Sequence, residues 1–430
     1  MPVFVVPVRD CWLVHAPLAG ISALVNTSGV TAPGLIPDLD QQRESPPGPR
    51  TGPIAPVFLG LLPTRACNMA CVYCGFGAPG APQSRMREET AVAAIDWAAR
   101  TAADRGAGSL AVHLFGGEPL LAKDLVEIIV HRTRAKASEY HLVPWLETAT
   151  NATCDEPFAR FVGDHFSAVI VSLDGFGEVQ NRHRPLKGGL PSFDAVCRTA
   201  HIWSQSPVKL CLRICVTADN VDQFAQAAEW FAEEFEPAVI DCETIEPSPE
   251  SRRAGLERPD PLVFAREFWR ARQLCAQAGV DVSYGASVTE HPRATLCPVG
   301  QDAVIVSPDG RISSCYLEQR DWQARGMDLD FGAVAESAVR LDLTALQRIR
   351  NLANPHGRCE KCFCRWSCAG GCHVTHSDLC RQTRLITAAE LLAGMGEPGH
   401  AADLLYDTPA AMRLACGVDD TIEDWRLCHV

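Results

Sequence analysis

The sequence predicts an α/β protein in which a partial, open (β/α)6 barrel precedes a cysteine-rich domain. Three observations lead to this fold class. Short apolar strands alternate with amphipathic helical stretches six times between residues 57 and 250. Six such units favour a parallel sheet with right-handed crossovers, but they are too few for a closed eight-stranded barrel. Cysteines gather after the first of these strands and again between residues 297 and 380.

The composition is that of an ordinary globular protein, with 47% hydrophobic and 21% charged residues among 430. The formal net charge of −13 argues against a general nucleic-acid binder. No apolar run is long enough to span a membrane, and the N-terminus lacks the features of a secretory signal. Twenty cysteines without an export signal indicate a reducing compartment, so we expect a cytoplasmic protein that binds neither nucleic acid nor membranes.

The chain before the barrel divides into two segments. Residues 1–30 predict a small β element, because apolar runs at 11–15 and 21–26 flank a turn that contains Pro17 and Gly20. Residues 31–56 form a Pro-rich linker that cannot bury a core. The open edge of a hairpin could bind an extended peptide by β-addition, and a hairpin that only covers the barrel is an equally good interpretation.

The barrel, over residues 57–250, takes its strands and helices from the hydrophobic pattern. We expect strands at residues 57–62, 109–115, 143–149, 168–173, 208–216 and 238–242. Helices are expected between them, including those at residues 88–105, 121–137, 192–203 and 221–235. Ligands of such sheets bind at the carboxyl ends of the strands, where Cys67, Gly116, Asn151 and Asp174 fall.

Three further segments complete the predicted organisation. A bridging region at residues 251–296 contains a helix at 261–278 and a short strand near Val282. A cysteine-rich domain follows at residues 297–385, and a helical tail at 386–430 has helices near 388–395 and 401–405.

Three cysteines follow the first barrel strand with the spacing C-x3-C-x2-C, namely Cys67, Cys71 and Cys74. Three thiolates are one fewer than a tetrahedral zinc site or a fully ligated iron–sulfur cubane uses. The pattern favours a 4Fe–4S cluster with one iron left open to a small molecule. A chance cluster of cysteines, or a zinc site with a distant fourth ligand, is the alternative.

This loop, in which Tyr73 is the aromatic residue of C-x3-C-x-aromatic-C, resembles the cluster loop of the radical SAM enzymes. The resemblance implies that the three thiols hold a 4Fe–4S cluster and that S-adenosylmethionine binds at the open iron. It also implies that the predicted barrel is the partial, TIM-like barrel of that family.

The ends of later strands resemble other segments of the family. The sequence at Gly116, Gly117 and Glu118 matches the GGEP motif, which implies that these residues hold the methionyl amino group of S-adenosylmethionine. A turn is the structural alternative. The segments around Asn151 and Ser172 resemble segments that contact the cofactor's ribose or carboxylate.

The segment that follows Ser172 also matches the family, and it implies that Arg184 pairs with the cofactor's carboxylate. Loop-capping hydrogen bonds are the alternative for Asn151 and Ser172, and a surface ion pair is the alternative for Arg184. On the fifth strand, Arg213 should face the barrel interior, where an unpaired charge is costly, so it needs an anionic partner such as Glu147, Asp174, Asp241, Glu243 or the cofactor carboxylate. A structural salt bridge is the favoured interpretation.

The second cysteine region begins with Cys297 and Cys315, between which Asp309-Gly310 predicts a β-hairpin turn. The remaining cysteines have the spacing C-x2-C-x5-C-x3-C with one more beyond, namely Cys359, Cys362, Cys368, Cys372 and Cys380. Without the first motif, a zinc ribbon would compete with an iron–sulfur interpretation. The full arrangement resembles the SPASM domain of radical SAM peptide maturases.

That resemblance implies two auxiliary 4Fe–4S clusters. One would be held by Cys359, Cys362, Cys368 and Cys380, and the other by Cys297, Cys315 and Cys372. Several members of the family have an extra cysteine where this chain has Ala303, so the second cluster could keep an open iron. Cys364 is surplus to the pattern, either as a fourth ligand or as an inert neighbour.

The resemblance covers about residues 57–380 and implies a peptide-modifying radical SAM oxidoreductase that acts on ribosomally made peptides. The enzyme would cleave S-adenosylmethionine reductively to a 5′-deoxyadenosyl radical and abstract hydrogen from a precursor peptide with a leader sequence. The product would be a carbon–carbon, thioether or ether crosslink. The electron would come from a low-potential donor such as flavodoxin or ferredoxin.

Two alternatives stay open from the sequence, which identifies no catalytic base. One is an anaerobic sulfatase-type maturase that forms formylglycine. The N-terminal hairpin, and Tyr316 where an Asp would follow Cys315, favour the crosslinking enzyme. The other is a non-catalytic iron–sulfur electron carrier, which would need neither the GGEP motif nor the barrel.

Overall fold

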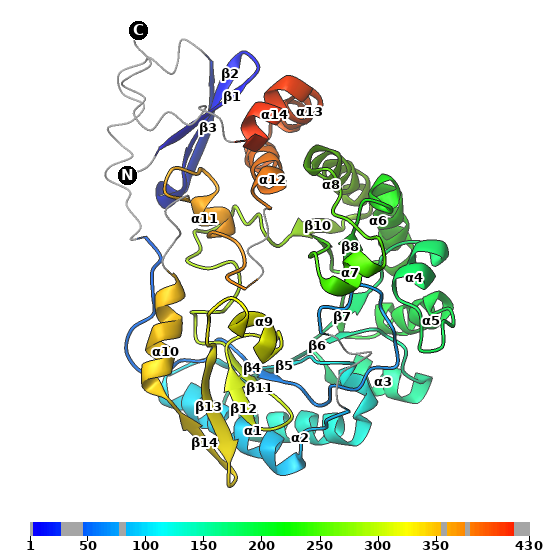
Figure 1. Ribbon diagram of the computed structural model, residues 1–430, viewed down its shortest axis with the longest axis vertical. Coiled ribbons are helices and arrows are strands. Elements are labelled where there is room, and N and C mark those ends of the chain that lie inside the picture. Colours follow the sequence, from blue (N-terminus) through cyan, green and yellow to red (C-terminus); the bar gives the residue numbers. More distant parts are fainter. Residues whose placement is uncertain (1–2, 27–45, 77–82, 354–358, 375–378, 417–430) are drawn as a thin grey trace.

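The computed structural model describes residues 3–26, 46–76, 83–353, 359–374 and 379–416, and Figure 1 shows how their elements are arranged. These residues form an eleven-stranded sheet and a three-stranded sheet. Helices lie along the outside of the large sheet, whose strands curve around an interior (Figure 1). Within the described ranges, no helix is both long and apolar enough to cross a bilayer.

The six predicted barrel strands are all present, and each is parallel to its neighbours in sequence order. They are β4 (Leu59–Leu61), β5 (Ser109–Leu114), β6 (Val143–Thr150), β7 (Ala168–Ser172), β8 (Lys209–Val216) and β9 (Val239–Thr244). Along β8, every second residue is fully buried and the residues between are half-buried or exposed, because one face lies under helices and the other lines the interior. The sheet does not close on itself, so the predicted open barrel is confirmed.

The sheet is longer than the six predicted strands. The short strand expected near Val282 is β10 (Asp281–Tyr284), a seventh parallel strand beside β9. At the other edge, β11 (Val304–Val306) lies parallel to β4. The predicted hairpin through Gly310 joins β11 to β12 (Arg311–Ser313), and two more antiparallel strands complete the order, β13 (Asp330–Ala335) and β14 (Ala338–Leu341). One sheet therefore runs through the barrel, the bridging region and the start of the cysteine-rich region.

The four named barrel helices are present. They are α1 (Glu88–Asp104), α2 (Lys123–Glu139), α5 (Phe193–Ser204) and α6 (Val221–Phe235). The structure adds α3 (Glu156–His165), α4 (Gly177–His183) and the short α7 (Pro249–Arg253). Helix α3 begins at this point because the Asp155 carboxylate accepts a hydrogen bond from the Phe158 amide at 3.2 Å, and because Pro157 suits a first helical turn.

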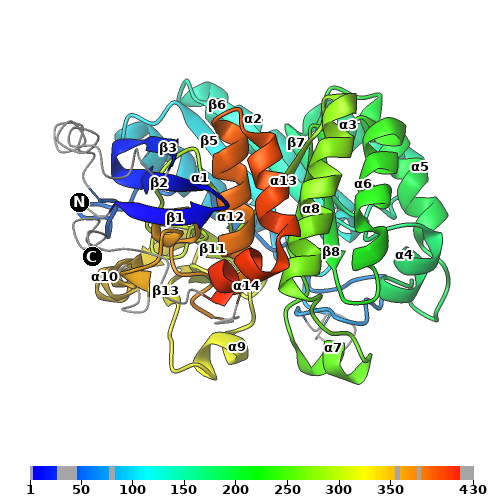
Figure 2. The same cartoon turned by 90° about the horizontal axis from the view of Figure 1, so that it is seen from above.

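The N-terminal β element has three strands rather than the two predicted. They are β1 (Phe4–Val8), β2 (Cys11–Ala16) and β3 (Ile21–Asn26), with the short 3-10 turn η1 (Pro17–Ala19) between the last two. Figure 2 shows β1 next to the C-terminal helices. These helices, α12 (Cys380–Gly394), α13 (Pro398–Tyr406) and α14 (Thr408–Cys416), pack with α8 (Pro261–Cys275). The tail beyond residue 416 lies outside the described residues.

The described end of the Pro-rich segment, residues 46–56, contains no helix or strand but is fastened to the core. The Arg350 guanidinium donates to the carbonyl of Gly52 at 2.7 Å and forms a buried ion pair with Asp302 at 2.6 Å. Asp302 also accepts a hydrogen bond from the Ala55 amide at 3.0 Å. Residues 27–45 of the predicted linker lie outside the described residues.

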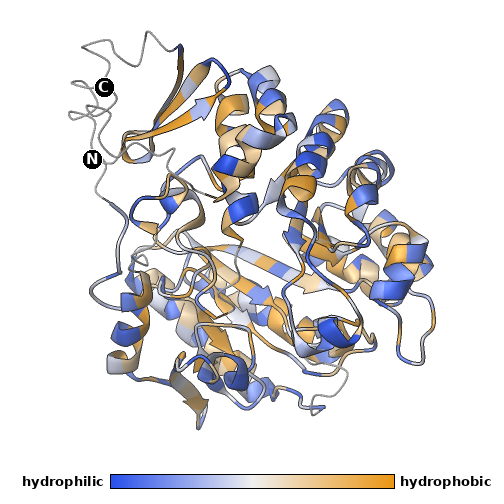
Figure 3. Ribbon diagram, turned by 45° about the horizontal axis from the view of Figure 1, so that its top comes forward, coloured by the Kyte–Doolittle hydropathy of each residue, from blue (hydrophilic) through white to orange (hydrophobic). Residues whose placement is uncertain are grey.

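The hydrophobic residues are concentrated on the strands at the centre of the molecule, as the orange colour in Figure 3 shows. Between the sheet and its outer helices, the core contains fully buried aromatic side chains such as Trp203, Phe231 and Phe264. This packing makes the sheet a rigid support, so that the loops at the strand ends can hold side chains in fixed positions.

Three short helices lie around the cysteine-rich region, namely α9 (Gln319–Gln323), α10 (Leu343–Arg350) and α11 (Arg365–Cys368).

Candidate active site

The loop that carries Cys67, Cys71 and Cys74 follows β4 and is bound by backbone hydrogen bonds to the end of α4 and the segment after it. The Ala70 amide donates to the Pro185 carbonyl at 2.8 Å, and the Val72 amide donates to the His183 carbonyl at 3.0 Å. The Met69 side chain is almost fully buried, which anchors the loop from within. These contacts therefore fix the position of the loop that carries the three thiols.

The environment of Cys67 and Cys71 favours the protonated form of these two thiols. Burial raises the pKa of Cys67 to about 11, with smaller contributions from the charges of Glu118 and Cys74, although the hydrogen bond from the Met69 amide opposes the rise. Burial likewise raises the pKa of Cys71 to about 12, with contributions from Cys74 and Cys67. The thiols thus lie close enough to influence one another. Such thiols give up their protons when a cation binds them, so this donor set fits a thiolate-ligated iron–sulfur cluster.

Two hydrogen bonds orient the Cys67 sulfur. It accepts from the Met69 amide at 3.4 Å and from the Asn151 side-chain amide at 3.8 Å. The same Asn151 amide group donates to Asn68 at 2.8 Å, and the Asn151 oxygen accepts from the Thr153 amide at 3.0 Å. These contacts match the loop-capping alternative for Asn151. They place the residue directly behind the cysteine loop, where it can orient a sulfur ligand.

The glycines after β5 allow two strand-end loops to touch. A side chain at Gly116 would overlap the carbonyl of Thr64, and a side chain at Gly117 would overlap the carbonyls of Arg65 and Ala66. Gly116 also has a φ of 141°, which L side chains rarely adopt. The Gly117 amide donates to the Thr64 carbonyl at 3.0 Å, so the predicted GGEP segment packs against the start of the cysteine loop.

Glu118 joins the ends of β5 and β6. Its carboxylate accepts from the Thr150 hydroxyl at 2.7 Å, from the Asn151 amide at 2.7 Å and from the Leu120 amide at 3.1 Å. Burial raises the pKa of Glu118 to about 7, although these three hydrogen bonds oppose the rise. The Glu118 carboxylate therefore already has three hydrogen-bond partners within the protein. Its predicted contact with the methionyl amino group of S-adenosylmethionine stays a prediction.

Asp174, at the end of β7, is the centre of a buried polar group. Its carboxylate pairs with the Arg184 guanidinium at 3.0 Å and accepts hydrogen bonds from the Tyr73 hydroxyl and, at 3.1 Å, from the Cys215 amide. The Arg184 guanidinium lies over the Tyr73 ring, 5.2 Å from its centre. Burial would raise the pKa of Asp174, but Arg184, His183 and Tyr73 outweigh burial and lower it.

This group changes how the predicted residues are understood. Arg184 is a buried ion-pair member, not the surface pair given as its alternative. Tyr73 links the cysteine loop to Asp174, because it lies between Cys71 and Cys74. Ser172 is half-buried on the inner face of β7, opposite Arg213 in the register of β8. The positions predicted to surround the cofactor therefore lie on adjacent strand ends around one loop.

The barrel interior beyond this group carries more charge. Arg213 pairs with Asp241 through two contacts at 2.8 and 2.6 Å, so the predicted anionic partner of Arg213 is present. Burial, followed by the charge of Asp241, raises the pKa of Glu243 to about 8. On β5, His113 lies 3.8 Å from Glu147, and burial lowers its pKa. Arg213 and Asp241 are register partners on β8 and β9, and His113 and Glu147 are register partners on β5 and β6.

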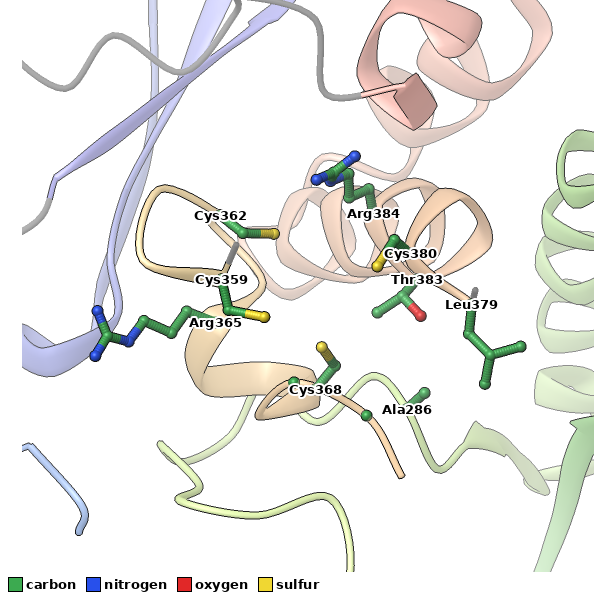
Figure 4. Close-up of a pocket in the computed structure, with 11 residues that line it drawn as sticks. Ala286, Cys359, Cys362, Arg365, Cys368, Leu379, Cys380, Thr383 and Arg384 are labelled. Carbon is green, nitrogen blue, oxygen red and sulfur yellow. The ribbon is translucent and has the colours of Figure 1, made fainter. Parts of the chain in front are cut away.

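Four cysteines of the second region line one pocket. Figure 4 shows the sulfurs of Cys359, Cys362, Cys368 and Cys380 directed toward a common space. The pocket has a volume of about 650 Å3 including its open mouth. Arg384, one helical turn after Cys380 on α12, also lines it. Four converging thiols beside a cation are chemically suited to a fully ligated iron–sulfur cluster.

Cys364 lies behind this pocket rather than on its wall. It is almost fully buried and is hydrogen-bonded to Cys362. That hydrogen bond, together with the charge of Arg384, lowers the pKa of Cys362 to about 6 despite burial. Burial raises the pKa of the pocket-lining Cys368 to about 12. The position of Cys364 favours the inert-neighbour interpretation, with a secondary effect on Cys362.

The three remaining cysteines of the pattern form a second set. Burial, with a smaller contribution from the charge of Cys372, raises the pKa of Cys297 to about 11 and that of Cys315 to about 12. Ala303, where a fourth ligand could have stood, is buried in an apolar patch with Phe58. Within the described residues, no group of three or more His, Cys, Asp or Glu side chains is arranged to hold a single metal ion.

Sequence reasoning missed two arginines that lie near these cysteines: Arg293, which is influenced by both sets, and Arg384, which lines the four-thiol pocket. Arg293 donates to the carbonyls of Ser367 at 2.8 Å and Gly285 at 3.0 Å, and the charges of Cys368 and Cys297 act on it. No local pattern indicates that role, because its partners are distant in sequence. Arg384 could have been found, since positions four residues apart share a helix face and Cys380 was already a candidate.

The family comparison agrees with this geometry. Residues 61–231 match the model of the radical SAM superfamily. The chain is 30% identical over 179 residues to the Fe-coproporphyrin III synthase of Methanosarcina barkeri, a match that spans 41% of each chain. It is 23% identical over 358 residues to the cysteine-type anaerobic sulfatase-maturating enzyme of Clostridium perfringens, which covers 78% of this chain and 92% of that enzyme.

Other relatives extend the comparison. The PqqA peptide cyclase of Gluconobacter oxydans is 26% identical over 276 residues, covering 63% of this chain and 72% of the cyclase. Among solved structures, native anSMEcpe with bound AdoMet aligns with a TM-score of 0.59 at 19% identity, covering 84% of this chain and 99% of that one. Streptococcus suis SuiB bound to the precursor peptide SuiA aligns with a TM-score of 0.51 at 14% identity, covering 76% of each chain. The match to the family model identifies residues 61–231 as a radical SAM domain, and the relatives of the chain include a sulfatase-maturating enzyme and a peptide cyclase.

Proposed function

We propose that this protein is a radical SAM peptide maturase that installs a crosslink in a ribosomally made precursor peptide. The single observation that carries the proposal is the meeting of three elements at one end of the barrel. These are the buried three-thiol loop, the glycine-rich segment that touches it, and the Tyr73–Asp174–Arg184 group. The same arrangement argues against an electron carrier, which needs neither the glycine-rich segment nor the barrel.

The proposed site assigns a role to each predicted residue. Cys67, Cys71 and Cys74 would hold a 4Fe–4S cluster, and S-adenosylmethionine would lie among the remaining candidates. Those candidates are Tyr73, Gly116, Gly117, Glu118, Asn151, Ser172 and Arg184. When bound, the cluster would supply the one-electron cleavage that yields the 5′-deoxyadenosyl radical. The chain itself orients these groups: Asp174 fixes Arg184 and Tyr73, and Glu118 fixes the ends of β5 and β6.

We propose two auxiliary 4Fe–4S sites in the second region, with ligands Cys359, Cys362, Cys368 and Cys380 for one, and Cys297, Cys315 and Cys372 for the other. Crosslinking removes two hydrogens from the peptide. One leaves as a hydrogen atom to the 5′-deoxyadenosyl radical, and the other leaves as a proton and an electron. The auxiliary sites would supply the acceptor for that electron.

The relatives support a peptide substrate, because one is named PqqA peptide cyclase and one solved structure is SuiB bound to the precursor peptide SuiA. A low-potential donor such as flavodoxin or ferredoxin would deliver the first electron. A reducing, cytoplasmic location is part of the proposal, because no disulfide joins the cysteines that the structure describes.

A formylglycine-forming maturase is the second candidate, and the long alignment with the sulfatase-maturating enzyme favours it. The products separate the two. Oxidation of Cys to formylglycine exchanges sulfur for oxygen and removes two hydrogens, whereas oxidation of Ser removes only two hydrogens, as a crosslink does. Only the aldehyde reacts with a hydrazide.

The test is anaerobic incubation of the reconstituted protein with S-adenosylmethionine and dithionite, followed by mass spectrometry of a co-expressed peptide encoded beside the gene. We expect 5′-deoxyadenosine, and a peptide that has lost two hydrogens per modification and does not react with hydrazide. Cys71→Ala should abolish 5′-deoxyadenosine. Cys197→Ala, at a half-buried cysteine that fits neither motif, is the matched control and should keep it. A hydrazide-reactive product would favour the second candidate, and the absence of 5′-deoxyadenosine would overturn both.

A further inference from the structure

Glu243 is an acidic residue of the barrel interior to which the proposed function assigns no role. It lies at the carboxyl end of β9, where its half-buried side chain stands between the buried residues Cys242 and Thr244. Its carboxylate lies against Gly285, because a side chain at that glycine would overlap a Glu243 carboxylate oxygen. The Gly285 amide donates a hydrogen bond to this carboxylate. The neighbouring backbone therefore fixes Glu243 at the end of the sheet where ligands of parallel sheets bind.

Glu243 also lies between the two cysteine regions. Its register partner on β8 is Cys215, whose amide donates to the Asp174 carboxylate at 3.1 Å. On the other side, the Gly285 carbonyl accepts from the Arg293 guanidinium at 3.0 Å, and Arg293 is influenced by both thiol sets of the second region. The side chain therefore stands between the site proposed for the radical and the site proposed for the electron acceptor.

Three other carboxylates near the strand ends already have strong partners. Asp241 accepts hydrogen bonds from the Arg213 guanidinium at 2.8 Å and from the Ser283 hydroxyl at 3.2 Å. Asp174 has its buried ion pair, and Glu118 has the three hydrogen bonds given above. Protonation of any of these three carboxylates would weaken contacts that hold the site together.

Glu147 also faces the interior, but it lies at a different depth. It is level with Ala168, the first residue of β7, whereas Glu243 is level with Cys215 near the end of β8. The Trp145 indole donates to the Glu147 carboxylate at 3.4 Å. Glu243 therefore combines a place at the carboxyl ends of the strands with few partners among the described residues.

The groups that face Glu243 make it a stronger base than an ordinary carboxylate. Burial, followed by the charge of Asp241, raises the pKa of Glu243 to about 8, with a smaller contribution from Glu246. The charge of Arg213 and the hydrogen bond from the Gly285 amide oppose this rise. A general base is most effective when its pKa lies near the operating pH, so this carboxylate suits proton transfer near neutrality. The other titratable groups on which its charge acts are Cys215 on β8, Cys242 on β9, Tyr284 on β10 and Arg293.

We propose that Glu243 is the general base of the crosslinking reaction and takes the proton that leaves the substrate peptide. The inference rests on the proposed function and deepens it by naming a catalytic residue. After the peptide has lost a hydrogen atom, its carbon radical forms a bond to a carbon, sulfur or oxygen atom of a second residue. The bond between that atom and its hydrogen breaks. The proton passes to the Glu243 carboxylate, and one electron passes to the oxidised 4Fe–4S acceptor proposed in the second region.

The test uses the full-length reconstituted holoenzyme and the peptide encoded by the reading frame beside the gene. Mass spectrometry measures 5′-deoxyadenosine and crosslinked peptide separately, and fluorescence anisotropy measures the affinity for the labelled peptide. Glu243→Gln keeps an acceptor for the Gly285 amide but cannot take a proton. We expect crosslinked peptide to fall about 100-fold, whereas 5′-deoxyadenosine formation and peptide affinity stay within about twofold of wild type.

Two further variants separate catalysis from a structural role. Glu243→Asp keeps a carboxylate and should recover part of the crosslinking that Glu243→Gln loses. Glu246→Gln is the matched control, because Glu246 is also a carboxylate near the end of β9 but is 41% exposed and pairs with Arg258 at 2.7 Å. All three measured quantities should stay within about twofold of wild type in this control.

The pH dependence supplies readouts that a structural role would not change. Crosslinking by the wild-type protein should increase up to a pH of about 8, as the Glu243 carboxyl ionises, and should not vary in this way in Glu243→Gln. The thermal unfolding midpoint needs neither peptide nor turnover. Because the folded-state pKa is raised, the stability of the wild-type protein should fall relative to Glu243→Gln as the pH rises from about 5 to about 8.

Three results would overturn the proposal. One is a Glu243→Gln variant that crosslinks at the wild-type rate. Another is an equal loss of 5′-deoxyadenosine, peptide affinity and crosslinking in that variant, because the residue would then be structural. The third is the same pH dependence of crosslinking in both proteins. A wild-type protein that forms 5′-deoxyadenosine but no crosslink would instead contradict the proposed function, and the inference would fall with it.

Discussion

The two cysteine regions place their thiols in different surroundings. The first region offers three thiols on a loop that touches a glycine-rich segment and a buried carboxylate, Glu118. The second offers four thiols that converge on one pocket beside Arg384. A set of three leaves a position for a small molecule, whereas a set of four closes its coordination. In the proposed function, the three-thiol loop of the first region binds S-adenosylmethionine, and the four-thiol set of the second region accepts electrons.

The largest expected effect comes from deleting each set in turn. Replacing Cys67, Cys71 and Cys74 by Ala should remove about a third of the bound iron and all cleavage of S-adenosylmethionine, because three clusters are proposed. Replacing Cys359 and Cys362 by Ala should remove a similar share of iron but leave cleavage detectable. Iron analysis and 5′-deoxyadenosine measurement check both. If both variants lose cleavage of S-adenosylmethionine equally, the two cysteine regions do not have the separate roles proposed for them.

A smaller effect is expected at Asp174. Asp174→Asn leaves Arg184 buried without its anionic partner, so we expect a loss of about 3 kcal/mol in the free energy of unfolding. Chemical denaturation at neutral pH measures it. Asp155→Asn is the control, since its pair with Lys123 is exposed and should contribute less than about 1 kcal/mol. Equal losses in the two variants would mean that the buried group does not stabilise the site.

The Asp174 variant also has a predicted pH dependence. The folded-state pKa of Asp174 is lowered, so its stabilisation is present above the usual pKa of an aspartate, about 4, and is lost as the pH falls below it. The stability difference between the wild-type protein and Asp174→Asn should therefore shrink in acid. A difference that grows as the pH falls from about 5 to 3 would contradict the lowered pKa.

Gly117→Ala should disturb the first region alone. The new methyl group would overlap the backbone of the cysteine loop, and we expect a loss of about 1–3 kcal/mol in the free energy of unfolding. Formation of 5′-deoxyadenosine should also fall. Gly108→Ala is the control, since no atom lies within 4 Å of its added carbon. Unchanged stability and activity in Gly117→Ala would show that the two loops do not need to touch.

The smallest effect is expected at Cys364. Because it lies behind Cys362 and not on the pocket wall, Cys364→Ala should leave the iron content unchanged within the error of about one atom per protein. Cys368→Ala, at a pocket-lining position, is the comparison and should lower it. Loss of iron in Cys364→Ala would make this residue a ligand and would change the ligand set of the second region.

The sequence predicted the barrel well because its signals are local. The six strands and their helices follow from hydrophobic period, and Arg213 followed from the cost of an unpaired charge inside the sheet. Strand β1 was harder, because it contains Pro7, which weakens a strand signal, and because the edge it occupies depends on distant helices. The pairing of β11 with β4 joins segments about 245 residues apart in sequence, and no local pattern encodes it.

The candidate site divides in the same way. The cysteines could be found by spacing, but the contacts of Asn151 with Asn68 and Thr153 depend on how two loops meet. The central position of Asp174 likewise follows only when β7, β8 and the cysteine loop are brought together. Residue type and spacing therefore indicated the chemistry, whereas the tertiary structure determined which side chains contact one another.

The most direct test of the central claim is the electron paramagnetic resonance spectrum of the reduced, anaerobically reconstituted protein before and after addition of S-adenosylmethionine. An open iron among Cys67, Cys71 and Cys74 predicts a 4Fe–4S signal that changes when S-adenosylmethionine binds. The change should be absent in Cys71→Ala and present in Cys197→Ala. A protein that binds zinc in place of iron, or a 4Fe–4S signal that S-adenosylmethionine leaves unaltered, would contradict the account.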